Sequence, residues 1–139
     1  MQQGALLGAD LQQRVDRLGI RDALRQPAPM GRTDLAALYR TASAVLVTSE
    51  SEGFGLPVIE ALACGAPVVA SDIPVLREVG GEACLYCTVA DVDAWTEAVI
   101  AVVTAGSAPA WVDRSAQAAR YTWSAHARTV LDGYRRLLP

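Results

Sequence analysis

Two glutamates, Glu52 and Glu60, flank a glycine-rich run that reads Gly-Phe-Gly-Leu-Pro at residues 53–57. Glycine lets a ligand approach the backbone closely, and a helix that begins at Pro57 would leave its first N–H groups unpaired. Those N–H groups and the positive end of the helix dipole form an anion site without any basic side chain. Carboxylates accept hydrogen bonds from sugar hydroxyls. These residue types therefore indicate a phosphate site between two hydroxyl-binding groups, as a nucleotide diphosphate sugar would require.

The two carboxylates also have a simpler interpretation. Glu52 can be a solvated loop charge, and Glu60 can be a residue near a helix start, where the dipole favours a negative side chain. On a single helix, eight positions would separate the two by roughly 12 Å. With Glu52 in the loop and Glu60 about one turn into the helix, both can face one cleft. The pattern alone leaves both interpretations open.

Helix and strand signals alternate around this loop, which predicts an α/β fold with a Rossmann-like parallel sheet and flanking helices. Short apolar runs predict strands at residues 44–48, 67–71 and 83–87, with the first covered on both faces. A connection of about 18 residues that contains a helix joins the first two strands, which indicates a right-handed parallel crossover. Ligands bind at the carboxyl ends of the strands in such sheets. The loop that carries Glu52 stands at such an end.

Apolar periodicity predicts helices around the strands, with Leu6 and Leu7 opening the first helix and Thr33 and Asp91 capping two later ones. A complete doubly wound domain has about five or six strands, whereas three are predicted here. We therefore expect one partial domain over residues 1–139, with one or two C-terminal helices at about 111–138. The predicted helical segments are 6–18, 33–39, 57–64, 74–79, 91–103 and 111–138.

Composition narrows the chemistry and the partners. Apolar residues make up 52% of the chain and charged residues 19%, which is too apolar for a disordered protein. A net charge of −3 argues against nucleic acid as a partner. All 12 basic residues are arginine and His126 is the one histidine, which excludes lysine chemistry and paired-histidine metal sites. No apolar run approaches the ~18 residues of a membrane helix, and we expect a cytoplasmic protein.

The three cysteines give little sign of metal or disulfide chemistry. Cys84 and Cys87 form a lone CxxC pattern inside a predicted strand, without the second pair of ligands that a zinc site needs. A structural role is therefore expected for both thiols.

Charged residues after the second predicted strand have two possible uses. Arg77 could meet a phosphate, although a surface ion pair with Glu78 or Glu82 is the favoured interpretation. Asp72 ends the strand, and we expect its side chain to cap the turn that follows.

The stretch EGFGLPVIEALACGAPVVASD at residues 52–72 resembles the signature of the retaining GT-B glycosyltransferases called group 1 or family 4. That family's motif is a pair of glutamates separated by seven residues, which Glu52 and Glu60 match. The flanking segments also resemble the family, as does YTWSAHARTVLDGYRRLL at residues 121–138. The resemblance covers nearly the whole chain from about Leu6, and it implies an incomplete C-terminal lobe of a GT-B fold.

The resemblance implies specific roles for the loop. Glu52 is the expected catalytic residue, which contacts the hydroxyls of the donor sugar, and Glu60 is expected to bind the ribose. No metal and no other cofactor is expected, because the donor substrate is itself the nucleotide diphosphate sugar. Backbone amides are expected to hold the diphosphate or the sugar at Gly53, Phe54, Gly55 and Leu56.

The same resemblance implies the donor-binding part of a transferase that moves a hexosyl-type group, with retention, to an unknown acceptor in glycan, glycolipid or polysaccharide synthesis. The family's acceptor-binding N-terminal domain and the basic pair that grips the diphosphate lie outside this sequence. We expect that domain to be supplied in cis or in trans, and to make any peripheral membrane contact. The chain alone is therefore expected to be inactive.

Two alternatives belong to other classes of protein. One is a non-catalytic nucleotide-sugar-binding module that needs a separate acceptor domain. The other is an α/β interaction domain in which the two glutamates are vestigial. At residues 25–31 the sequence RQPAPMG replaces a family strand that ends in Phe-x-Gly, which puts base contacts near Met30 and Gly31 outside the expected site.

Overall fold

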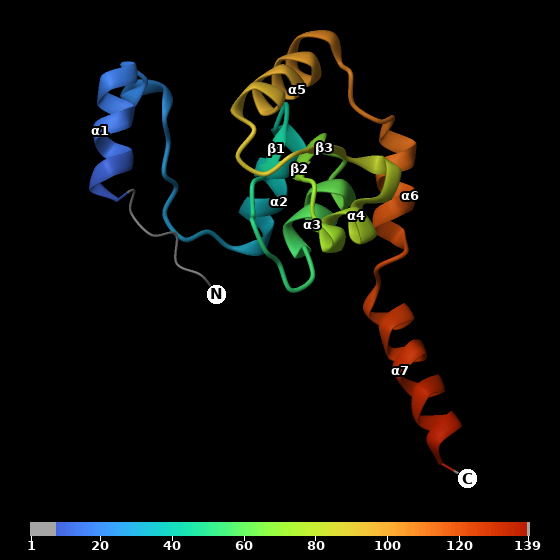
Figure 1. Cartoon of the computed structure of the whole chain (residues 1–139). Helices are drawn as coiled ribbons and strands as arrows, with labels where there is room; N and C mark the ends of the chain where they lie inside the picture. The colour runs from blue at the N-terminus through green and yellow to red at the C-terminus, as the bar shows by residue number, and fades with distance from the viewer. Residues whose placement is uncertain (1–7, 139) are drawn as a thin grey trace. The chain divides into compact units, whose positions relative to one another are not determined.

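A computed structural model describes residues 8–138, which fall into two compact units divided between Leu35 and Ala36 (Figure 1). Leu6 and Leu7, expected at the start of the first helix, lie outside the described residues. The first unit holds helix α1 (Ala9–Leu18) and the 3-10 turn η1 (Arg21–Ala23). Gly19 ends α1, with a φ of 64° and its N–H donating to the Asp16 carbonyl. Residues 24–31 form neither helix nor strand.

The second unit is built on a three-stranded parallel sheet in the order β1-β2-β3. The strands are β1 (Val45–Val47), β2 (Val68–Ser71) and β3 (Leu85–Cys87), and each lies inside its predicted run. Helix α3 (Leu56–Ala63) makes the crossover from β1 to β2. The predicted α/β fold with a parallel sheet is therefore confirmed.

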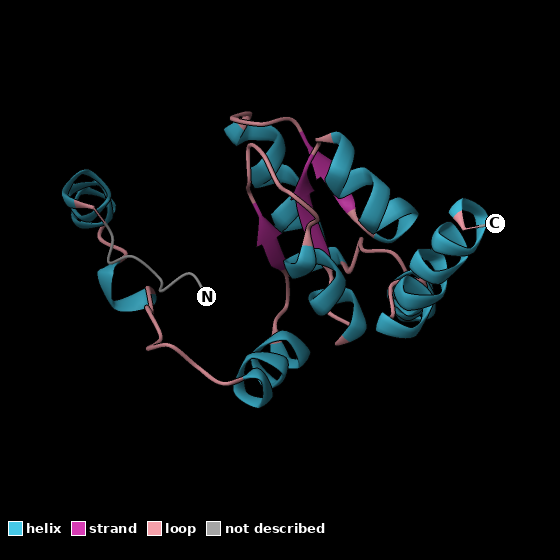
Figure 2. Ribbon diagram, turned by 90° about the horizontal axis from the view of Figure 1, so that it is seen from below, coloured by secondary structure: helices cyan, strands magenta, loops and turns pink. Residues whose placement is uncertain are grey.

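Helices cover both faces of the sheet (Figure 2). One face packs on α2 (Arg32–Thr41), α3, α4 (Pro74–Gly80) and α6 (Trp111–Ala119) around a core that includes Leu62 and Leu76. A second 3-10 turn, η2 (Gly81–Ala83), joins α4 to β3. The opposite face packs on α5 (Val92–Ala105) alone, with Val69 at its centre.

Helix caps confirm one prediction and correct another. The Asp91 carboxylate caps α5 by accepting from the Ala94 N–H at 3.0 Å. Thr33 was expected to cap α2, but the helix begins at Arg32 and so Thr33 lies inside it. The C-terminal segment forms two helices, α6 and α7 (Trp123–Leu137), and Thr122 caps α7 by accepting from the Ala125 N–H at 3.1 Å.

Strand β1 departs from the expected burial. Val47 is buried, but Leu46 on the α5 side is 48% exposed, so the prediction that both faces are covered is wrong. The reason is position, because β1 is an edge strand among the described residues and pairs there only with β2. Within residues 8–138, no helix is both long and apolar enough to cross a bilayer.

The buried thiol of Cys84 predicts a loss of stability at high pH. Burial raises the pKa of Cys84 from 9.0 to about 11, and burial also raises the pKa of Tyr86 and of Cys87. A group whose pKa is raised by folding stabilises the protein below its unfolded pKa, and this contribution is lost as the pH rises through the folded value. We expect the free energy of unfolding in urea to fall from about pH 9 to about pH 11, with roughly 2 kcal/mol of the loss due to Cys84.

The Cys84→Ala variant should be less stable at neutral pH but should lose less on going to high pH. Cys64→Ala, which alters the half-buried cysteine that caps the end of α3, serves as the matched control and should retain the full loss. An unchanged slope in Cys84→Ala would show that other groups cause the alkaline loss.

Candidate functional site

The loop between β1 and α3 places a turn of unpaired backbone donors at the carboxyl end of a strand. Gly55 adopts the left-handed conformation (φ 81°, ψ 36°) immediately before α3, which begins at Leu56, one residue earlier than predicted. The Gly55 carbonyl accepts from the Val58 N–H at 3.0 Å and so starts the helix. Within the described residues, the N–H groups of residues 53–56 donate to no acceptor. Such a turn can bind an anion through its backbone.

Glu52 is oriented by a residue that the sequence analysis missed. The Ser49 hydroxyl donates to Glu52 Oε1 at 2.6 Å, and both residues are half-buried in the loop. Glu52 Oε2 has no hydrogen bond within residues 8–138 and is free to accept one from a ligand. The signal for Ser49 was its place three residues before Glu52, directly after the strand.

Glu60 lies on the exposed side of α3, apart from Glu52. Glu60 interacts electrostatically with Tyr39 on α2. The pKa of Tyr39 is raised mainly by burial, and further by the charges of Glu60 and Cys64. In the part of the chain that the structure describes, no hydrogen bond or ion pair links Glu60 to Glu52 or to an arginine. The structure thus places both carboxylates around α3's first turns without joining them directly.

The two apolar residues of the loop remain accessible, while its central glycine is enclosed. Phe54 is 50% exposed and Leu56 is 55% exposed, whereas Gly55 is buried. A Cβ added to Gly55 would stand 2.9 Å from Leu76 Cδ2 and 3.0 Å from Val79 Cγ2, both on α4. Only glycine combines this φ with so close an approach, so α4 fixes the path of the loop.

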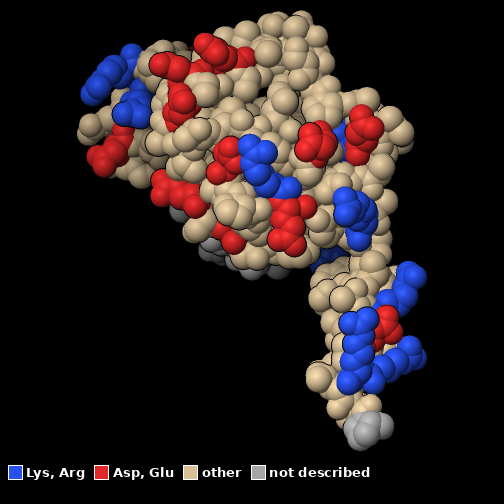
Figure 3. Space-filling view, turned by 45° about the vertical axis from the view of Figure 1, so that its right-hand side comes forward, with Lys and Arg blue, Asp and Glu red and all other residues tan. Residues whose placement is uncertain are grey.

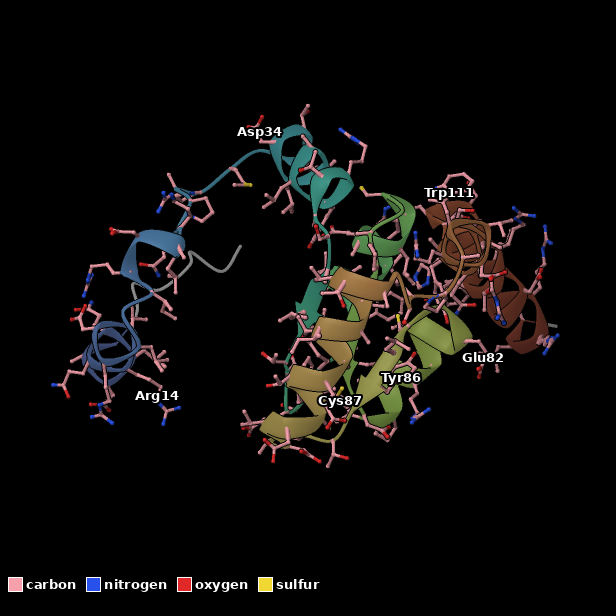
Figure 4. The ribbon with its side chains drawn as sticks, turned by 90° about the horizontal axis from the view of Figure 1, so that it is seen from above. Arg14, Asp34, Glu82, Tyr86, Cys87 and Trp111 are labelled. Atoms are coloured by element: carbon pink, nitrogen blue, oxygen red, sulfur yellow. The ribbon has the colours of Figure 1, made fainter. Side chains whose placement is uncertain are left out.

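A cation network holds α4 against the sheet. Arg77 donates to both carboxylate oxygens of Asp72, with 2.7 Å between Nη2 and Oδ2, and its guanidinium stacks 4.6 Å from the centre of the Tyr86 ring. The hydrogen bonds lower the pKa of Asp72 and raise that of Arg77. Tyr86 reaches from β3 toward α4 and donates to the Gly81 carbonyl at 2.9 Å (Figure 4).

These contacts correct two sequence-based interpretations. Arg77 pairs with Asp72, so the favoured pairing with Glu78 or Glu82 is wrong. Asp72 does not cap α4, which begins after Ile73 without any side-chain cap, because its carboxylate is committed to Arg77. Arg77 is therefore neutralised locally instead of offering an open charge to a phosphate.

The remaining charges are unevenly distributed over the surface. On the face shown in Figure 3, blue arginines gather along α7, which carries Arg128, Arg135 and Arg136. Acidic side chains are more frequent over the sheet-containing part of the same view. Across the described residues, no group of three or more His, Cys, Asp or Glu side chains is arranged to hold a metal ion.

A separate pocket of about 550 Å³ opens on the α5 side of the sheet. The hydroxyl of Ser71 is buried there and has no hydrogen-bond partner among residues 8–138. None of the loop residues predicted from the sequence line this pocket. Its lining comes from the ends of β1 and β2, the turn after β3 and one face of α5, namely Leu46, Thr48, Glu50, Ser71, Val89, Ala90, Val92, Trp95, Thr96, Val99 and Ile100.

These features define a parallel α/β domain with a glycine-rich loop at the carboxyl end of a strand, a class of fold that binds ligands at this edge. The family described as "Glycosyl transferases group 1" matches residues 8–119. The chain belongs to this family of glycosyltransferases.

Named relatives agree with this assignment. A D-inositol 3-phosphate glycosyltransferase from Mycobacterium marinum is 36% identical over 135 residues, which cover 92% of this chain and 29% of the relative. The protein of the same name from Frankia alni is 39% identical over 128 residues, which cover 87% of this chain and 31% of the relative. The chain thus spans less than a third of the length of these relatives.

A solved structure gives the fold. Sucrose-phosphate synthase from Thermosynechococcus elongatus superposes with a TM-score of 0.80 at 27% identity, over 91% of this chain and 33% of the other. The three-stranded sheet with its helices is therefore part of a GT-B glycosyltransferase fold, as the resemblance implied.

The packing of Gly55 can be tested by adding one methyl group. We expect Gly55→Ala to lower the free energy of unfolding by about 2–4 kcal/mol, because left-handed backbone strain adds to a clash with Leu76 and Val79. Urea unfolding measures the loss. The matched control is Gly106→Ala, where φ is 62° but open space surrounds the new methyl, so only the strain of about 1–2 kcal/mol is expected. Equal losses in the two variants would contradict a packing role for α4 at the loop.

Proposed function

We propose that this chain binds the donor of a group 1 glycosyltransferase, a nucleotide diphosphate sugar, and supplies the donor half of a retaining hexosyl transfer. The observation that carries the proposal is the turn at residues 53–56, whose N–H groups have no acceptor within the described residues and which stands beside the Ser49-oriented carboxylate of Glu52. In this proposal the amides hold the diphosphate and Glu52 Oε2 accepts from a sugar hydroxyl.

Each group then has a task in the reaction. Negative charge gathers on the departing diphosphate as the glycosidic bond breaks, and fixed N–H donors aimed at that charge lower the barrier. The hydrogen bond from Ser49 holds the Glu52 carboxylate in place, with Oε2 left to accept from the sugar. Glu60, exposed on α3, binds the ribose hydroxyls. The chain uses no metal in this scheme, since backbone donors serve the diphosphate.

Two tasks of the proposed reaction, basic contacts to the diphosphate and binding of the acceptor, are assigned to a separate domain. Arg77 on α4, the helix that packs on the loop, is paired with Asp72. In this proposal the basic side chains that bind the diphosphate therefore come from a domain supplied in cis or in trans. We propose that the same domain binds the acceptor, and that the 139 residues alone do not catalyse transfer. The relatives' names make a phosphorylated cyclitol or sugar the first acceptor to try. The cytoplasmic location expected from the sequence stays a prediction.

Binding of the donor can be measured on the chain as it stands. We expect UDP, GDP or ADP to bind in a calorimetric titration, and Glu60→Gln to weaken the tightest of the three about tenfold or more, as loss of hydrogen bonds to a charged group does. Glu97→Gln, an exposed carboxylate on α5, is the control and should bind like the wild type.

The ribose contact has its own readout. The 2′-deoxy form of the same nucleotide should bind the wild type more weakly. Glu60→Gln should reduce the affinity for this form by a smaller factor, because the missing hydroxyl is one that Glu60 binds in the proposal. Absence of any binding at millimolar nucleotide would favour the interaction-domain alternative. Binding without transfer when the chain is joined to an acceptor domain of a relative would favour the non-catalytic module.

A further inference from the structure

Tyr121, in the short segment between α6 and α7, touches three separate parts of the second unit. Its ring meets the ring of Phe54 edge-on, with 6.1 Å between the centroids and 82° between the planes. Its hydroxyl donates to the Glu78 carbonyl at 2.8 Å, and its N–H donates to the Ala118 carbonyl at 3.0 Å. This one residue thus links the end of α6, the end of α4 and the loop before α3.

Gln117, one turn earlier on α6, makes a parallel contact. Its Nε2 donates to the Val79 carbonyl at 2.8 Å. The last carbonyls of a helix have no partner inside the helix, so Gln117 and Tyr121 satisfy two such groups at the end of α4. Both bonds join residues that are about 40 positions apart in the chain (38 and 43), so they are set by tertiary packing.

The two contacts converge on the glycine-rich loop from different sides. Tyr121 lies against Phe54, while Leu76 and Val79 of α4 press on Gly55. Phe54 is half-exposed, so its ring has few other neighbours to fix its direction. An edge-to-face aromatic pair supplies both attraction and a preferred angle.

We propose that Tyr121 is a positioning residue for the donor loop: it holds Phe54, and with it the N–H groups of residues 53–56, in the arrangement that receives a diphosphate. The part of this statement that concerns the diphosphate rests on the proposed function, whereas the hold on the loop does not.

The chain contains one phenylalanine, which gives a direct probe. Incorporation of 4-fluorophenylalanine places a single fluorine resonance on Phe54. In the wild type we expect this resonance to be shifted by the Tyr121 ring and to show a nuclear Overhauser contact with its protons. Tyr121→Leu should return it toward the free amino-acid value, and Tyr121→Phe, which keeps the ring, should hold most of the shift.

Tyr134→Leu is the matched control, because Tyr134 is an exposed tyrosine on α7. It should leave the fluorine resonance unchanged. Hydrogen exchange of residues 49–57 should rise in Tyr121→Leu and not in Tyr134→Leu. Absence of the Overhauser contact in the wild type overturns the proposal, even if Tyr121→Leu fails to fold.

Nucleotide affinity tests the functional part separately. With the tightest of UDP, GDP or ADP, Tyr121→Leu should weaken binding by roughly two- to tenfold, the span that one aromatic pair accounts for. Tyr121→Phe should weaken it less. If the wild type binds none of the three, the proposed function fails while the fluorine results still decide the hold on the loop. If Tyr121→Leu loses the fluorine shift yet binds the nucleotide like the wild type, the positioning role is wrong.

Discussion

The close approach of α4 to Gly55 is the constraint on which the site depends. A left-handed φ of 81° turns the chain from the end of β1 into α3, and the absent side chain lets Leu76 and Val79 pack directly on that turn. The same helix is secured from two other directions, by the Arg77–Asp72 pair and by side chains of α6. The turn of free N–H groups is therefore a consequence of packing, and it exists before any ligand arrives.

This arrangement explains how a chain without lysine can offer an anion site. Its one arginine on α4 is held between Asp72 and the Tyr86 ring, which leaves little free positive charge near the loop. Backbone donors do not depend on side-chain charge and need no reorganisation when a ligand binds. Membership in the group 1 glycosyltransferases is consistent with the proposed function, in which backbone amides and carboxylates of this chain bind the donor.

Local signals predicted much of this fold and long-range contacts account for what they missed. The three strands, the helix after the glycine-rich run and the Asp91 cap follow from patterns within a few residues, and all are present. Sequence spacing could not identify the partner of Arg77, because Asp72, Glu78 and Glu82 are all close enough in the chain to pair with it. Tyr121 was further out of reach, since its contact with Phe54 joins positions brought together only by the packing of α6 on α3.

The pocket beside α5 is an alternative to the loop as the place where the proposed donor would bind, and the chemistry of its lining favours the loop. Its lining is largely apolar, it contains no arginine, and its one charged group is the carboxylate of Glu50. The helix that starts in this lining, α5 at Val92, is already capped by the Asp91 carboxylate. A diphosphate there would meet negative charge, at a considerable desolvation cost. The loop before α3 presents four successive backbone positions and a carboxylate already oriented by Ser49. The buried, unpaired Ser71 hydroxyl and the half-exposed Leu46 mark the α5 side as incompletely packed, which accounts for its volume without assigning it the diphosphate.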